Sequence, residues 1–178
     1  MHALSRLIVL AAILVVAGGT AQAADPENTI LMDVPAGRVV IELRPDLAPK
    51  TVARIKELTR RGFYDGIIFH RVIAGFMAQT GDPKGTGTGG SGQKLAAEFS
   101  KEHHVRGTVS MARAQDPNSA DSQFFICFAP APFLDGKYTI FGKVTAGMEF
   151  IDAIAKGEPP AKPDKIIKMQ VAADAKKS

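Results

Sequence analysis

The sequence predicts a mainly β fold: a closed, eight-stranded antiparallel β-barrel whose open ends are covered by two α-helices. Short runs rich in β-branched and aromatic residues recur between glycines, prolines and asparagines, at a spacing typical of sandwiches and barrels. Only two segments carry an apolar stripe at helical spacing. Strands and helices do not alternate, so a parallel sheet is not expected.

The first predicted element is a β-hairpin. Residues 29–34 (TILMDV) and 38–43 (RVVIEL) are separated by Pro35-Ala36-Gly37, which suits a three-residue loop containing glycine. Further β-like runs predict six more strands, over residues 67–73, 76–80, 108–112, 123–128, 139–145 and 165–171.

The two predicted helices cover residues 48–62 and 148–157. In the first, Val52, Ile55 and Leu58 share one face, with Pro49 near its start and glycine as its stop. The second repeats this pattern with Met148, Ile151 and Ile154. One helix follows the second strand and the other precedes the last, which is consistent with helices placed over the ends of a barrel.

The N-terminus reads as a secretory signal peptide over residues 1–23. A short positive region precedes an apolar run from Leu7 to Ala17, and Ala21-Gln22-Ala23 forms an A-x-A cleavage site. The apolar run is shorter than the roughly 20 residues that a membrane-spanning helix needs. We therefore expect cleavage after Ala23, a periplasmic protein and no stable membrane association afterwards. An uncleaved membrane anchor is the alternative.

The remaining residues, 24–178, suit one domain, with a core over about 29–171 and a frayed tail over 172–178. The whole chain has a net charge of +4 without a long basic block, so no nucleic-acid partner is expected. Cys127 is the single cysteine; it cannot form an intramolecular disulfide and is expected to be a small buried hydrophobe. Nothing in the sequence demands more than a monomer.

The glycine-rich segment over residues 85–92 matches GxGxxG through Gly87, Gly89 and Gly92. A dinucleotide site would also need a strand directly before the glycines, a helix after them and an acidic residue about 20 positions on. That context is missing. A loop whose backbone approaches another surface closely explains the glycines better.

Metal binding and covalent catalysis are not supported by the remaining motifs. The four histidines lack the spacing and the cysteine partners of a zinc site, and no GxSxG nucleophile motif occurs. The sequence therefore predicts neither a metal nor a cofactor.

Arg71 lies in a largely apolar predicted strand, although arginine is seldom fully buried unless it is paired. Taken alone, it would be placed on a solvated face or in a structural ion pair. In the run QFFICF, however, period two places Gln123 and Phe125 on one face and Phe124 and Ile126 on the other. Large apolar groups on both faces of a strand indicate a pocket on the outer one.

The run FMAQT shows the same pattern, since Met77 and Gln79 share a face, with Phe76 predicted opposite. Arginine, glutamines, phenylalanines and a methionine would form an apolar site that is neutral to positive and has no carboxylate acid or base. For Arg71, this constellation favours a place beside a pocket.

Three segments resemble motifs of the cyclophilin family of peptidyl-prolyl cis-trans isomerases. They are FHRVIAGFMAQTGD (69–82), SMARAQDPNSADSQFFIC (110–127) and LDGKYTIFGKV (134–144). The resemblance covers about residues 29–171 in the family's order. It implies a cyclophilin-like barrel and an enzyme that accelerates rotation about X-Pro bonds in proline-containing peptides and unfolded exported proteins, assisting their folding.

The resemblance also assigns roles to individual residues. It makes Arg71 catalytic together with Gln79, and Gln123 supports the arginine and the substrate backbone. The pocket for the proline ring would be formed by Phe76, Met77, Phe125 and Leu134. The rest of the substrate groove would be lined by His70, Gly87, Ala112, Arg113, Phe133 and Tyr138.

This chain departs from the family's pattern at several of these positions. Phe133 stands where many members have tryptophan, so the indole hydrogen bond that favours cyclosporin is missing and weak binding is expected. Arg113, Tyr138, Ala74 and Thr80 replace a common asparagine, histidine, proline and glycine. Of these, Arg113 could alter the preference for residues flanking the proline.

The assignment sets a structural condition for Arg71. Its guanidinium should face a cavity lined by Phe76 and Phe125, and it should not be tied up by a carboxylate. A peptide-binding module without turnover is the alternative of a different class, although an intact arginine and pocket favour turnover.

Overall fold

The computed structural model describes residues 25–175. The predicted signal peptide, residues 1–23, lies outside the described residues. The described chain forms eight strands in one sheet, with every pairing antiparallel. The strands are β1 (Thr29–Val34), β2 (Gly37–Leu43), β3 (Arg71–Ile73), β4 (Met77–Thr80), β5 (Thr108–Met111), β6 (Phe124–Cys127), β7 (Ile140–Ala146) and β8 (Lys168–Val171).

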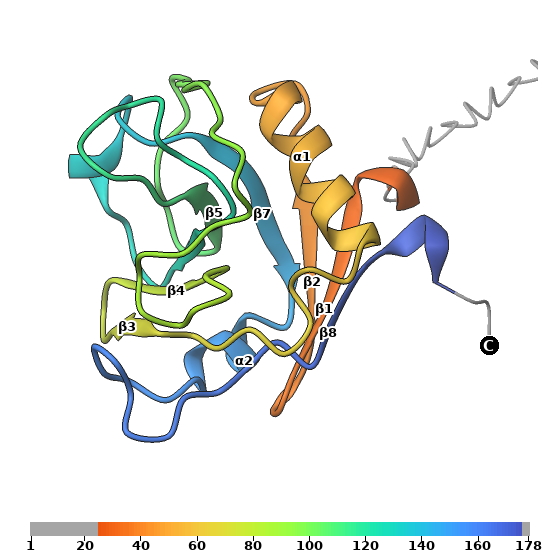
Figure 1. The fold of residues 1–178 in the computed structure, drawn as a ribbon, viewed down its shortest axis with the longest axis vertical. Helices are drawn as coiled ribbons and strands as arrows, with labels where there is room; N and C mark the ends of the chain where they lie inside the picture. The colour runs from red at the N-terminus through yellow and green to blue at the C-terminus, as the bar shows by residue number, and fades with distance from the viewer. Residues whose placement is uncertain (1–24, 176–178) are drawn as a thin grey trace, which may run out of the picture.

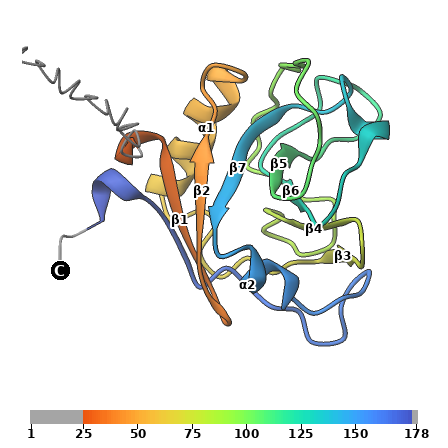
Figure 2. The same ribbon diagram turned by 180° about the vertical axis from the view of Figure 1, so that it is seen from behind.

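The sheet has the order β3-β4-β6-β5-β7-β2-β1-β8 and curls into a half-barrel (Figures 1 and 2). The predicted closed barrel is not confirmed, because the described strands β3 and β8 form no ladder with each other. Residues 66–69 and 164–166 meet there instead, through an isolated bridge between Ile68 and Lys165 and a few backbone hydrogen bonds. Three prolines lie between residues 159 and 163, and proline has no N–H to donate to a ladder.

Several strands are shorter than predicted, and the difference is largest beside this opening. The predicted strand over 67–73 is a strand only from Arg71, and that over 165–171 only from Lys168. In the first hairpin Val34 pairs with Gly37, so the loop has two residues, Pro35 and Ala36, in place of the predicted three.

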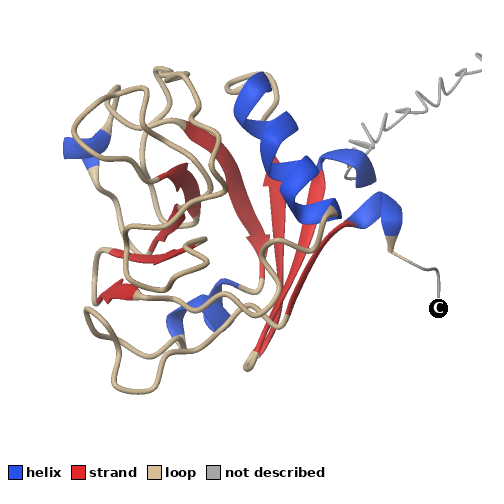
Figure 3. Ribbon diagram, viewed as in Figure 1, coloured by secondary structure: helices blue, strands red, loops and turns tan. Residues whose placement is uncertain are grey.

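Helices α1 (Pro49–Arg60) and α2 (Met148–Asp152) lie towards opposite ends of the curled sheet (Figures 1 and 3). In α1 the predicted apolar face is buried, and proline occupies its first turn. By contrast, α2 stops five residues before its predicted end. The chain leaves the helix there because Ala155 N donates to a carboxylate oxygen of Asp164, while Lys156 Nζ donates to the carbonyls of Asp152 and Ile154.

Alternation along the strands separates two apolar clusters, as predicted for β6. Phe124 and Ile126 belong to the main core inside the curl of the sheet. Phe125 and Cys127 belong to a second cluster, which also contains Met77, Ala131 and Leu134. Cys127 is buried as expected, and burial raises the pKa of its thiol to about 12.

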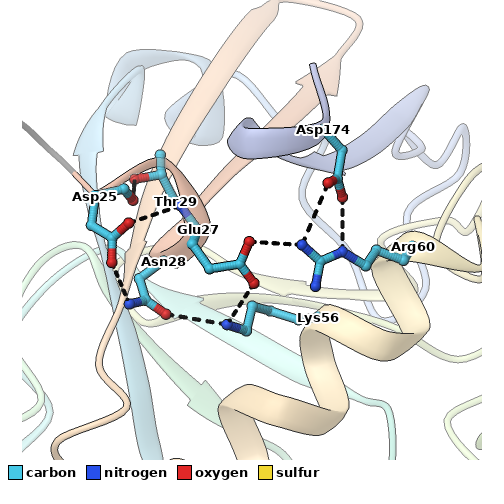
Figure 4. A network of polar contacts seen from close by, with 7 residues as sticks. All are labelled: Asp25, Glu27, Asn28, Thr29, Lys56, Arg60 and Asp174. Carbon is cyan, nitrogen blue, oxygen red and sulfur yellow. Dashed lines mark hydrogen bonds and ion pairs between the residues drawn. The ribbon is translucent and has the colours of Figure 1, made fainter. Parts of the chain in front are cut away.

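The two ends of the described chain are joined by ion pairs (Figure 4). Three short 3-10 helices also occur in the described chain: η1 (Pro26–Asn28), η2 (Pro132–Leu134) and η3 (Ala172–Asp174). Arg60 of α1 contacts Glu27 of η1 and Asp174 of η3, both at 2.8 Å. Hydrogen bonds from Arg60 and Lys56 lower the pKa of Glu27 to about 2. Residues 172–174, at the start of the predicted frayed tail, form η3, and Asp174 pairs with Arg60 there.

Within residues 25–175, the helices are too short or too polar to cross a lipid bilayer.

Candidate functional site

Three neighbouring strands carry the candidate site on the outer face of the sheet. Register places Arg71 of β3 opposite Gln79 of β4, and Gln79 opposite Phe125 of β6. Met77 of β4 lies opposite Cys127 of β6. Since residues at alternate positions of a strand share a face, these side chains lie on one face of the sheet, in two adjacent rows.

A cavity of about 110 Å³ opens above these rows. Its lining brings together most of the predicted site: Arg71, Phe76, Met77, Gln79, Ala112, Arg113, Phe125, Leu134 and Tyr138. The ring of Phe125 is held from two sides, stacked on His104 at 6.1 Å and edge-on to Tyr138 at 6.0 Å between ring centroids. The wall that Phe125 gives to the cavity is therefore well packed from behind.

The placement of Phe76 opposite Met77 is wrong. Phe76 precedes β4 and lies in the turn that joins it to β3, so strand alternation does not apply to it. Its side chain packs against the second apolar cluster and lines the cavity. The ring of Phe133 lies 5.3 Å from that of Phe76 but is not part of the cavity lining, and Phe133 is 61% exposed.

The Arg71 guanidinium meets one half of the condition set from the sequence. Arg71 is among the residues that line the cavity, together with Phe76 and Phe125. However, its Nε donates to Oε1 of Glu158 at 2.7 Å. Among the described residues, the two terminal nitrogens of this guanidinium have no further hydrogen bond. A carboxylate therefore holds one nitrogen of the guanidinium, and the two terminal nitrogens have no protein partner among the described residues.

Gln79 and Gln123 are joined to each other. Gln79 Nε2 donates to Gln123 Oε1 at 2.9 Å, and Gln123 Nε2 donates to the carbonyls of Gly87 and Gly89. Between Gln79 and Arg71, both described, no hydrogen bond is present. The oxygen of Gln79 thus remains an acceptor at the cavity.

A second cavity, of about 620 Å³, adjoins the first and shares Gln79, Ala112 and Arg113 with it. The glycine-rich loop forms one wall and contributes Gly87. An added Cβ would clash with an Asp82 oxygen at Gly89, and at Gly90 it would lie 2.6 Å from an Asp121 oxygen. The predicted close approach of this loop to another surface is thereby confirmed.

Arg113 is fixed at the junction of the two cavities. Its guanidinium lies 4.6 Å from the centroid of the Tyr138 ring. It donates to the carbonyls of Lys137, Ala114 and Gln115. These contacts make Arg113 part of the wall, with its donors directed largely to the backbone.

His70, like Phe133, is a predicted site residue that the structure does not bring to either cavity. It is buried, and neither ring nitrogen has a partner within residues 25–175. Burial lowers the pKa of His70 below its usual value. Its imidazole lies under the glycine-rich loop, 3.8 Å from where a Cβ of Gly87 would be.

Sequence reasoning missed two supports of the site. One is Glu158, and the other is Asp135, which lies behind the cavity. Asp135 accepts a hydrogen bond from His104 N at 2.8 Å and pairs with the Nδ1 atoms of His103 and His104. These hydrogen bonds, the one from His104 N foremost, lower the pKa of Asp135. No local pattern in the sequence indicates either contact, because Glu158 and Asp135 are distant in the sequence from the side chains that they hold.

Within residues 25–175, no group of three or more histidine, cysteine, aspartate or glutamate side chains is placed to hold a metal ion.

Comparisons with known proteins agree with this geometry. The family model described as cyclophilin type peptidyl-prolyl cis-trans isomerase/CLD matches residues 29–171. The Probable peptidyl-prolyl cis-trans isomerase of Brucella suis is 56% identical over 174 residues, covering 88% of this chain and 89% of the relative. Peptidyl-prolyl cis-trans isomerase B of Bacillus subtilis is 47% identical and covers 68% and 85%.

Two solved structures are similar over most of the chain. The cyclophilin AquaCyp293 from Hirschia baltica matches with a TM-score of 0.80 and 30% identity, covering 86% of this chain and 77% of that one. A cyclophilin type isomerase of Cryptosporidium parvum, crystallised in the presence of the dipeptide Ala-Pro, matches with a TM-score of 0.75 and 32% identity, covering 80% and 98%.

Proposed function

The chain belongs to the cyclophilin-type peptidyl-prolyl cis-trans isomerase family and is an isomerase of X-Pro bonds, and from this premise we propose that its 110 Å³ cavity receives the proline ring. One observation carries the proposal: Arg71 lines the same cavity as Phe76, Met77 and Phe125. A ring held there places its peptide bond beside a permanent cation. The substrates are proline-containing peptides, in keeping with the Ala-Pro dipeptide crystallised with the related isomerase.

The chemistry is rotation about a partial double bond, with a barrier of roughly 18–20 kcal/mol. A guanidinium that donates to the prolyl nitrogen, or that grips the neighbouring carbonyl, favours the twisted state over the planar one. One hydrogen bond of a charged group contributes about 1.5–3 kcal/mol, which corresponds to roughly one to two powers of ten in rate. The arginine therefore accounts for only part of the acceleration.

The cavity supplies the remainder by differential binding. Its non-polar walls hold the ring still while the preceding carbonyl swings, and they exclude the water that stabilises the planar, dipolar amide. Gln79, whose oxygen is a free acceptor among the described residues, is placed to bind the substrate backbone.

Replacing Arg71 with alanine tests this assignment. We expect kcat/KM for a proline-containing peptide, followed by exchange NMR, to fall by about 10- to 100-fold with the fold intact. Arg61→Ala is a matched control, because Arg61 is an exposed arginine of the α1 C-terminus whose contact is with Glu57. Full isomerisation by the Arg71→Ala variant would contradict the assignment.

We also propose that the enzyme acts after export, as a single mature domain in the periplasm that assists the folding of exported proteins. The signal-like pattern of residues 1–23 supports this. Mass measurement of the exported protein tests it: cleavage after Ala23 should leave Ala24 as the first residue, and a full-length mass would contradict it.

A further inference from the structure

The Glu158 carboxylate is placed beside Arg71 by the backbone. Glu158 lies in the loop between α2 and β8. Val72 N donates to Gly157 O at 2.8 Å, and Gly157 N donates to Val72 O at 2.9 Å, so this loop continues the sheet along the free edge of β3. In an antiparallel pair, the residues flanking a bridged pair also face each other. Glu158 is therefore the cross-strand neighbour of Arg71.

The loop is also anchored beyond Glu158. Phe69 N donates to Asp164 O at 2.9 Å, and the Asp164 carboxylate accepts from Ala155 N at 2.8 Å. Both ends of the segment 157–164 are thus hydrogen-bonded to the chain around β3 and α2. The carboxylate itself is about half-exposed, with 52% of the side-chain surface accessible.

The pairing uses the one guanidinium nitrogen that is least suited to reach the substrate. Glu158 accepts from Nε of Arg71 at 2.7 Å, while the two terminal nitrogens lie further along the side chain. We propose that Glu158 is a positioning residue, which fixes the Arg71 side chain so that its terminal N–H groups point into the cavity. This inference rests on the proposed role of Arg71.

An arginine that is already held in the productive orientation speeds the isomerisation, because it does not have to be ordered during the reaction. A long arginine side chain loses considerable rotamer freedom when it is held in one orientation, and prior ordering of a reacting group accelerates a reaction. Exposed ion pairs contribute little individually, about 0.2–1 kcal/mol, so the gain from this ordering is small. The expected effect of removing the carboxylate is a loss of about two- to fivefold in kcat.

Three variants separate orientation from charge. Glu158→Ala should lower kcat by about two- to fivefold, with KM changed less than about twofold. Glu158→Gln should keep most of the activity, because an amide oxygen still accepts from Nε. Glu149→Ala is the matched control: it removes the same charge from an exposed residue of α2 whose side chain makes no hydrogen bond or ion pair within residues 25–175, and it should behave as the parent.

An NMR readout follows the arginine directly. The Nε–H resonance of Arg71 should be sharp and shifted in the parent, the Glu158→Gln variant and the Glu149→Ala variant, and should move to the position of a free arginine in Glu158→Ala. In an Arg71→Ala background, Glu158→Ala should change the residual kcat less than about twofold, since the carboxylate then has no guanidinium to position.

The outcomes are distinguishable. If Arg71→Ala keeps full activity, the proposed role of Arg71 fails. If Arg71→Ala is impaired but Glu158→Ala keeps the parent kcat or exceeds it, the positioning role alone is overturned. The same holds if Glu158→Gln is as impaired as Glu158→Ala, because the charge would then matter and the hydrogen bond would not.

Discussion

Replacing Phe125 with alanine removes the central wall of the cavity in which we propose that the proline ring binds, and it should affect stability and activity by different amounts. Phe125 is 5% exposed. Its ring packs among Met77, Cys127 and Leu134 and contacts the rings of His104 and Tyr138. One side of the ring borders the cavity, so this substitution enlarges a space that is already open.

The loss of stability should lie at the low end of the range for a buried phenylalanine. Phe→Ala substitutions in cores cost about 3–5 kcal/mol, and the cost grows with the cavity that is left. Because part of the space beside Phe125 is already open, we expect about 3 kcal/mol. For a domain of this size that corresponds to a fall in Tm of roughly 6–12 °C.

The loss of activity follows from the contact with the substrate. A proline ring brings three CH₂ groups, each worth about 0.8 kcal/mol when buried. Phe125 is one of four non-polar side chains larger than alanine in the cavity lining, with Phe76, Met77 and Leu134. If Phe125 provides a quarter to a half of the burial energy of the proline ring, its loss costs roughly 0.6–1.2 kcal/mol. This loss predicts a fall in kcat/KM of about three- to eightfold.

The assay is kcat/KM by exchange NMR at a temperature where each variant is folded, and Phe124→Ala is the control. Phe124 neighbours Phe125 on the same strand but is fully buried in the main core against the rings of Tyr64 and Phe141. Its loss should cost at least as much stability and leave kcat/KM within about twofold. The reasoning is refuted if Phe125→Ala, when folded, turns over at the parent's rate, or if both variants lose activity equally.

Three further outcomes are expected. Since Cys127 is fully buried and burial raises the pKa of its thiol to about 12, the thiol should react with a disulfide reagent at neutral pH only when the protein opens; rapid labelling of native protein would contradict this. Phe133→Trp should tighten cyclosporin binding by roughly two- to tenfold through one added hydrogen bond, measured by calorimetry; unchanged affinity would place the ligand elsewhere. Because hydrogen bonds lower the pKa of Asp135 in the folded state, they contribute stability above the unfolded pKa of about 4 that is lost as the pH falls below it. Asp135→Asn should therefore flatten the fall of Tm between about pH 4 and pH 2, and an unchanged slope would argue against that coupling.

The parts of the site that could be predicted from the sequence are those determined by neighbours along the chain. Alternation in QFFICF correctly separated Phe124 and Ile126 from Phe125, because a strand turns successive side chains to opposite faces. The same rule was wrong for Phe76, which lies in a turn. Period two holds only where the backbone is extended.

What could not be predicted depends on segments that are distant in the sequence. Arg71 and Glu158 are separated by 87 positions, and only the path of the loop along β3 brings them together. The open half-barrel could not be predicted for the same reason. Residues 67–70 and 165–167 have a strand-like composition, but this composition does not show that the two segments meet through only a few isolated hydrogen bonds. His103 and His104 likewise gave no sign of the aspartate, more than 30 residues on, that holds them.

The ion pairs that join η1 and η3 through Arg60 have a practical consequence. They bring the first and last described residues together on the side of the sheet away from β3 and β4 (Figure 1). A short linker from residue 175 to residue 25 could therefore close the chain into a ring. Reopening that ring at the exposed turn of Pro35 and Ala36 would yield a circular permutant with its proline cavity intact.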